Sequence, residues 1–335
     1  MRLSPREMSS NDLRRVAVVA FTVLISGAAC TGDWPDPPPV DAGEFAAAHE
    51  EWRSNREARM VTPPGGAVLW MGLFPLAQGE VQMGSDPDLT IVLPEEDAPA
   101  LVGTLTLTGQ EVTFAPAPGS PLALQDGPVI TESTVLENDR SGNTTYITLG
   151  SLGMRIHAEP GTDRLWLRVW DTDLPLRETF ELPEYYPVDT EWRVAARLEL
   201  YPELRGVPLA DVTGGMIEQN ALGELVFERD GREHTLIAVG TEESSSYFIM
   251  MWDSTATTET YQAGRYLRVE KVDEEGWTTI DFNRSYNAPC VFTAFSVCAL
   301  PPRENWLDLP VTAGEKRPDK PAYEGVADRG PSGEG

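Results

Sequence analysis

The feature that most constrains this chain is a long succession of short apolar or alternating runs, each bounded by glycine, proline, aspartate or asparagine. Strands of β-sandwiches and barrels have this pattern, because alternate side chains point to opposite faces and the breaking residues suit turns. We expect a first series of strands at residues 68–74, 80–83, 90–93, 102–108, 111–115, 129–136, 145–149, 152–157 and 164–170, and a second at 191–201, 223–228, 233–239, 246–252, 264–271 and 276–282.

The two series predict an all-β fold with two halves. We place a helix and a β-sandwich in residues 42–184, and a second β-rich half, a sandwich or a barrel, in residues 185–316. Asp230-Gly231 between two apolar runs is typical of a tight hairpin turn. A chain of 335 residues is long enough for two domains or for one continuous unit, and both arrangements stay open.

One helix is expected, directly before the strands. Asp41 followed by Glu44 is a plausible start, and Phe45, Ala48 and Trp52 share one face. The sequence Pro63-Pro64-Gly65-Gly66 ends the pattern.

The N-terminus has the layout of a secretory signal peptide over residues 1–30. Two arginines precede the apolar run from Val16 to Ile25, and small residues lead to Cys30. This ending resembles a bacterial lipobox, which predicts an exported protein anchored in the cell envelope through a lipid on Cys30. The alternative is a plain signal peptide with an incidental cysteine. Residues 31–41 are rich in proline and predict an extended tether, and residues 317–335 predict a disordered tail.

The charge excludes one class of partner. Asp and Glu number 53 against 26 Lys and Arg, a formal net charge of −27. Such a surface repels phosphate backbones, so no nucleic acid partner is expected. If Cys30 carries a lipid, Cys290 and Cys298 remain as an even pair, and in an oxidising compartment they predict a disulfide.

The densest group of polar residues lies between Asp281 and Glu315 and does not read as strand. Long ordered loops inside compact domains are often functional. We therefore interpret this loop as the lining of a polar pocket; the alternative is that its side chains only brace the loop. The candidate ligand-binding residues are Arg265, Asp281, Asn283, Tyr286, Asn287, Asn305 and Glu315.

Familiar catalytic and metal motifs are not found. His49, His157 and His234 have no spacing used by zinc sites, and no phosphate-binding glycine loop or nucleophile elbow occurs. The acidic pairs at Asp171-Thr172-Asp173 and Asn138-Asp139 lack the spacing of a calcium loop and favour solvated turns. No cofactor and no metal are expected.

Several segments resemble a bacterial family known as domain of unknown function 1684, over roughly residues 51–316. The resemblance rests on Gly72-Leu73-Phe74, Gly84-Ser85-Asp86-Pro87, Tyr186-Pro187, Trp192-Arg193-Val194, Thr260-Tyr261, Gly264-Arg265, Asp281-Phe282-Asn283, Tyr286-Asn287, Pro289-Cys290, Cys298, Pro301-Pro302, Asn305 and Ala313-Gly314-Glu315. The family implies an architecture and no established activity.

A second resemblance lies within the first half. Residues 72–93 and Leu149-Gly150-Ser151-Leu152 look like the strand order of a forkhead-associated β-sandwich. In that fold an arginine holds phosphothreonine, and Ser85 stands at that place here. The resemblance thus implies a sandwich whose phosphopeptide site is lost.

Three functions remain in view. The leading one is binding of a small polar or sugar-like ligand, or of an envelope partner, at residues 281–305. The first alternative is a hydrolase-like enzyme that uses Asp281 or Glu315 as general acid or base, with Arg265 or Asn283 stabilising developing charge. The second is a structural surface protein.

Overall fold

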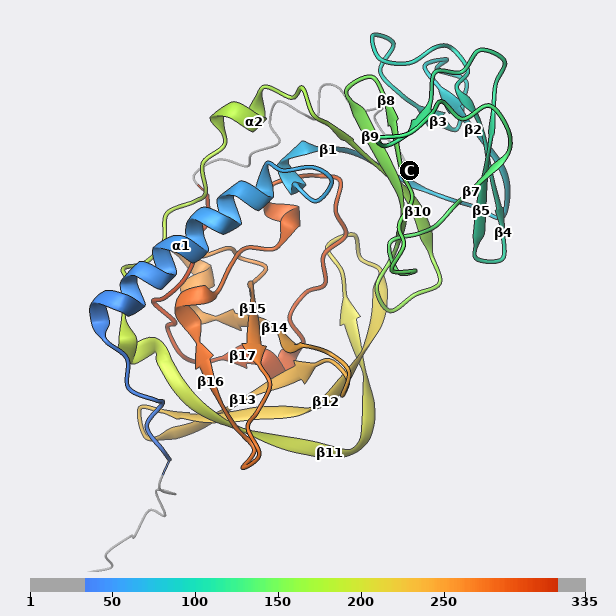
Figure 1. The fold of residues 1–335 in the computed structure, drawn as a ribbon. Coiled ribbons are helices and arrows are strands. Elements are labelled where there is room, and N and C mark those ends of the chain that lie inside the picture. The colour runs from blue at the N-terminus through green and yellow to red at the C-terminus, as the bar shows by residue number, and fades with distance from the viewer. Residues whose placement is uncertain (1–33, 319–335) are drawn as a thin grey trace, which may run out of the picture. The chain divides into compact units, whose positions relative to one another are not determined.

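The computed structural model describes residues 34–318, which fall within one compact unit of the chain. The predicted signal peptide with Cys30, the first residues of the predicted tether and nearly all of the predicted tail lie outside the described residues. The all-β prediction is confirmed: strands form three sheets, and one helix is longer than a single turn within residues 34–318 (Figure 1).

Helix α1 spans Ala42–Met60 and begins as predicted. The Asp41 carboxylate caps it by accepting hydrogen bonds from the backbone N–H groups of Gly43 (2.9 Å) and Glu44 (3.0 Å). The other helix, α2 (Leu176–Thr179), is one turn long. Within residues 34–318 no helix has both the length and the apolar character that a membrane span requires.

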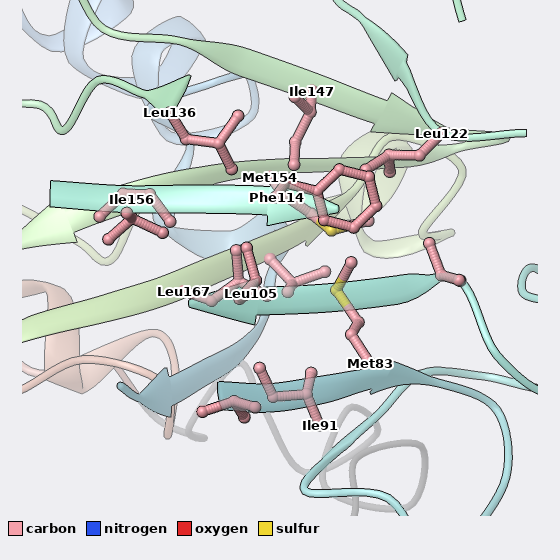
Figure 2. Close-up of a cluster of buried hydrophobic side chains, with 14 of the residues drawn as sticks. Met83, Ile91, Leu105, Phe114, Leu122, Leu136, Ile147, Met154, Ile156 and Leu167 are labelled. Atoms are coloured by element: carbon pink, nitrogen blue, oxygen red, sulfur yellow. The ribbon is translucent and has the colours of Figure 1, made fainter. Parts of the chain in front are cut away.

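Two five-stranded sheets build the first half. One has the order β1 (Trp70–Pro75), β10 (Leu165–Asp171), β9 (Leu152–Ala158), β8 (Tyr146–Leu149) and β6 (Ala123–Leu124). The other has the order β3 (Ile91–Val92), β2 (Gly79–Gly84), β4 (Gly103–Thr108), β5 (Glu111–Pro116) and β7 (Thr134–Leu136). Inward side chains from both sheets form one apolar core, which includes Met83, Leu105, Phe114, Met154 and Leu167 (Figure 2). The predicted sandwich architecture follows from this shared core.

A seven-stranded sheet builds the second half. Its order is β15 (Arg265–Glu270), β14 (Ser246–Asp253), β13 (Arg232–Val239), β12 (Met216–Arg229), β11 (Arg193–Ala210) and β16 (Trp277–Asp281), and the short β17 (Trp306–Leu307) pairs with β14. The outer strands β15 and β16 also meet, because the Thr278 hydroxyl donates to the Glu270 carbonyl (3.0 Å). The sheet is therefore a nearly closed barrel.

The hairpin predicted at Asp230-Gly231 is present between β12 and β13. Both residues have positive φ, 55° and 73°, and Arg229 pairs with Arg232 across the turn. Aspartate and glycine tolerate this left-handed backbone, which matches the twist of the flanking strands.

The chain itself occupies the barrel interior. Leu307, Leu309, Val311 and Ala313 pack into the same apolar core as residues of the barrel strands, such as Phe227. The predicted long loop is ordered around three short helical turns, η4 (Phe282–Arg284), η5 (Pro289–Val291) and η6 (Arg303–Asn305). We call residues 281–316 the core loop, and its part from Leu307 to Ala313 fills the barrel.

The described part of the predicted tether does not project freely. The Trp34 ring packs edge-on against Trp277, with ring centroids 5.5 Å apart, and the Arg193 guanidinium donates to the Pro38 carbonyl (2.9 Å). Residues 34–38 thus lie on β11 and β16. These contacts stabilise a docked position for residues 34–38, and the extended tether stays a prediction.

Candidate functional site

The core loop is held by side chains that the sequence suggested as ligand contacts. The Asn305 amide oxygen accepts from the Ile237 backbone N–H (2.7 Å), and its amide nitrogen donates to the Met250 carbonyl (2.8 Å). Both bonds are buried and join the loop to β13 and β14. Asn305 therefore satisfies backbone groups that would otherwise be buried without partners.

A buried ion pair fixes the C-terminal part of the core loop. The Arg265 guanidinium on β15 lies 2.8 Å from the Asp253 carboxylate, and both side chains are excluded from solvent. Arg265 also donates to the carbonyls of Val311 (2.9 Å) and Ala313. One guanidinium thus neutralises a buried charge and ties the loop to the barrel wall.

Helix α1 covers the core loop and is bonded to it at two places. At the first, the two ring nitrogens of His49 lie 2.8 Å from the Phe45 carbonyl and 2.8 Å from the Asp281 carboxylate. Both are acceptors, so the ring satisfies both bonds when it carries two N–H groups. Burial alone raises the pKa of Asp281, but the hydrogen bonds from His49 and Asn283 and the charge of Arg284 hold this pKa below its usual value.

At the second place, Arg56 of α1 meets the fully buried Glu315. Their side chains are 3.0 Å apart, and Arg56 also donates to the Asn287 carbonyl (3.2 Å). Glu315 accepts a further bond from the Asn287 backbone N–H. Burial raises the pKa of Glu315, and the positive charge of Arg56 opposes this rise. The pair locks α1 onto the core loop.

Beside this contact lies a cavity of about 460 Å³. Helix α1 supplies one aromatic ring and two guanidinium groups to its wall. Strands β14 and β15 supply a hydroxyl, an apolar side chain, a guanidinium and a carboxylate, and the core loop supplies an aromatic ring and a guanidinium. The lining residues are Trp52, Arg56, Arg59, Ser246, Arg268, Val269, Glu270, Arg284 and Tyr286.

A second cavity, of about 500 Å³, adjoins the first and shares Arg268, Glu270 and Arg284 with it. Its other lining includes Phe45 of α1 and Asp281 of β16. We call the two cavities together the α1 groove. Its walls carry guanidinium, carboxylate, hydroxyl and aromatic groups, which suits a small polar ligand with an apolar part.

The structure separates the seven candidate residues into two groups. Tyr286 lines the first cavity and Asp281 lines the second. The others are almost completely buried and bonded within the chain, and they line neither cavity of the groove: Arg265, Asn283, Asn287, Asn305 and Glu315. The bracing alternative therefore describes these five residues.

The groove residues that the sequence interpretation missed lie on the barrel strands and on α1, which supplies Phe45, Trp52, Arg56 and Arg59. The expected apolar face was Phe45, Ala48 and Trp52, but Ala48 is exposed, and the buried positions are Phe45, His49, Arg56 and Met60. The sequence signal for the α1 part of the groove is the spacing of the arginines at residues 53, 56 and 59, which places cations along the helix at intervals of three. The apolar face expected for this helix does not include these arginines, since a polar side chain shows no sign in the sequence of its buried partner.

Cys290 and Cys298 are free thiols in the structure, so the expected disulfide is not present in it. They are nonetheless neighbours, because the Cys290 backbone N–H lies 3.1 Å from the Cys298 sulfur. Disulfide formation stays a prediction.

Other polar candidates are braces as well. Asp139 binds His157 (2.7 Å), and the Asp171 carboxylate accepts from the Asp173 backbone N–H (2.9 Å). Across residues 34–318, no three His, Cys, Asp or Glu side chains come together in a way that would hold a metal ion.

Comparison with known proteins gives a family without an assigned activity. Residues 178–316 match the model of a family described as a protein of unknown function, DUF1684. A solution NMR structure of the uncharacterized protein from gene locus rrnAC0354 of Haloarcula marismortui is 30% identical; the match covers 42% of this chain and 78% of that chain, with a TM-score of 0.35. No curated protein matches the chain. The resemblance expected for residues 51–316 is thus confirmed over the barrel and the core loop.

Proposed function

We propose that this chain, which belongs over residues 178–316 to the family of unknown function DUF1684, is a binding protein that holds a small polar molecule in the α1 groove. The observation that carries the proposal is the pair of adjoining cavities, about 460 and 500 Å³, lined by charged and aromatic side chains from three separate parts of the chain. Small-molecule sites are typically concave, with converging polar groups that fix the orientation of the ligand.

The hydrolase-like alternative has less support. Glu315 is bonded to Arg56 and to the Asn287 backbone N–H, and it lines neither cavity of the groove. Asp281 lines the second cavity, but its carboxylate is held by His49 and its lowered pKa is wrong for a general acid near neutral pH. These carboxylates have the bonding of structural groups.

A lipid-anchored position in the cell envelope is part of the same proposal. It is supported by the arginine-led apolar run from Val16 to Ile25 and by Cys30, which follows small residues. Mass spectrometry of the mature protein tests it: a diacylglyceryl mass on an N-terminal Cys30 is expected, and an unmodified N-terminus beyond Cys30 would contradict it.

The first half has a separate interpretation. Its two packed sheets support a forkhead-associated-like sandwich, and Ser85 in place of the phosphate-binding arginine argues against phosphopeptide recognition there. We assign it a supporting role, with the ligand site in the second half.

A thermal-shift screen tests the binding proposal. The purified protein is heated with sugars, amino acids, organic acids, nucleotides and lipid head groups, and a ligand that binds only the folded state raises the melting temperature. A ligand at one hundred times its Kd adds roughly 2.7 kcal/mol to the free energy of unfolding.

Two tryptophan variants locate the site. Trp52→Ala removes a ring from the groove, and Trp306→Ala removes a half-exposed ring that lies outside it. The proposal expects the shift to persist in Trp306→Ala and to fall strongly in Trp52→Ala. No shift with any compound, or an equal shift in both variants, would place the function elsewhere.

A further inference from the structure

The first cavity of the α1 groove carries charges that the chain does not neutralise. Within residues 34–318, Arg59 and Arg268 have no ion pair, whereas Arg56 pairs with Glu315 and Arg284 lies 3.6 Å from the Asp281 carboxylate. The one carboxylate in the lining, Glu270, also has no ion pair among the described residues. Two unpaired cations and one unpaired anion leave a surplus of one positive charge.

This surplus is notable because acidic residues outnumber basic ones twofold in the chain. In a chain this acidic, two guanidinium groups that line one cavity without an ion pair among the described residues offer a place for the negative charge of a ligand. Arginine suits carboxylate oxygens because its planar fork presents two parallel N–H donors.

The other walls of the cavity define the remainder of the ligand. Trp52 and Tyr286 supply aromatic rings and Val269 an aliphatic side chain. Arg56, which is almost completely buried, keeps its Nε without a hydrogen-bond partner among the described residues. A donor that is buried and unpaired is costly unless a ligand accepts from it.

We propose that the ligand of the α1 groove is a small organic monocarboxylate with an apolar or aromatic body. Arg59 and Arg268 bind its carboxylate, and its body lies against Trp52 and Tyr286. This inference rests on the proposed binding function and deepens it by naming the chemical class of the ligand.

Matched probes test the class. Isothermal titration of the purified protein compares benzoate and phenylacetate with benzamide and phenylacetamide, which keep the body and remove the charge, and with inorganic phosphate, which keeps an oxyanion and removes the body. We expect the carboxylates to bind at least about tenfold more tightly than their amides, and their affinity to fall with added salt because part of the attraction is screened.

Two substitutions with opposite expected effects on carboxylate affinity make the test specific. Arg268→Gln is expected to weaken carboxylate binding about tenfold to a hundredfold, the range of one hydrogen bond to a charged group. Glu270→Gln removes the opposing negative charge and is expected to strengthen the same binding several-fold. Both residues are exposed on β15, so neither change is expected to disturb the core. Arg232→Gln, an exposed arginine outside the groove, is the control and should change nothing.

The outcomes separate the two proposals. If the amides bind as well as the acids, and Trp52→Ala abolishes both, the groove binds ligands but the carboxylate inference is overturned. The carboxylate inference is also overturned if phosphate binds while benzoate and phenylacetate do not, or if Glu270→Gln weakens the binding of these carboxylates. If no probe binds and the broad screen also shows no shift, the binding function itself fails.

Discussion

The substitution Arg265→Met should be among the most damaging single changes in the barrel. It leaves the Asp253 carboxylate buried without its counter-ion, which lay 2.8 Å away with both side chains excluded from solvent. Breaking a buried ion pair by removing one partner costs about 3–5 kcal/mol. Asp253 keeps hydrogen bonds from the backbone N–H groups of Thr255 (3.0 Å) and Val311 (3.2 Å), so we expect the lower end, about 3 kcal/mol.

Urea denaturation measures this loss as a lower midpoint at unchanged slope. Hydrogen exchange should show lost protection in residues 309–316, because Arg265 no longer binds the carbonyls of Val311 and Ala313. Arg232→Met, on the exposed surface of β13, is the matched control. The double variant Arg265→Met/Asp253→Asn should lose less than the sum of the single losses, since the two charges are coupled. A loss below about 1 kcal/mol for Arg265→Met, or full additivity, would refute the reasoning.

Three further predictions concern the helix contact, the core loop and the hairpin. The folded pKa of Asp281 lies below its ordinary value of 3.8, so its contribution to stability is complete above that value and is lost as the pH falls through the lower folded pKa; Asp281→Asn should flatten this part of an acid unfolding curve, and an unchanged curve would contradict it. Asn305→Leu should cost about 2–6 kcal/mol in denaturation, because it leaves the Ile237 N–H and the Met250 carbonyl without partners at roughly 1–3 kcal/mol each; a neutral result would show that both groups find other partners. Gly231→Val places a β-branched residue at φ 73° and should cost about 1–2 kcal/mol, whereas Gly65→Ala, with open space around its Cβ position and no positive φ, should be nearly neutral.

Strand positions could be predicted because alternation and turn residues are local properties. The expected strand at 233–239 is β13 (Arg232–Val239), and the one at 152–157 is β9 (Leu152–Ala158). The main shortfall is β11, expected to end near residue 201 and observed to reach Ala210. Pro202 and Pro208 argue against a strand there, but the pairing with β12 resumes after an irregularity between Leu200 and Arg205. Long-range pairing overrides the local signal.

The candidate site was predicted only in part. The sequence marked the polar residues of the core loop, and two of them, Asp281 and Tyr286, line the α1 groove. It did not show that Arg265 and Glu315 face buried partners, because the residues that neutralise them lie on other elements: Asp253 at the end of β14 and Arg56 on α1. A polar side chain in a sequence looks the same whether it binds a ligand or a carbonyl.

Local chemistry therefore determines the elements of this protein: the strands by their alternation, the hairpin by Asp230-Gly231, and the start of α1 by Asp41. Tertiary structure decides what those elements enclose. The barrel nearly closes where β15 meets β16, part of the core loop fills its interior, and α1 brings Arg56 and Arg59 beside Arg268 and Arg284. Such tertiary contacts depend on the free energy of burying and pairing groups that lie on different elements, which no local pattern encodes.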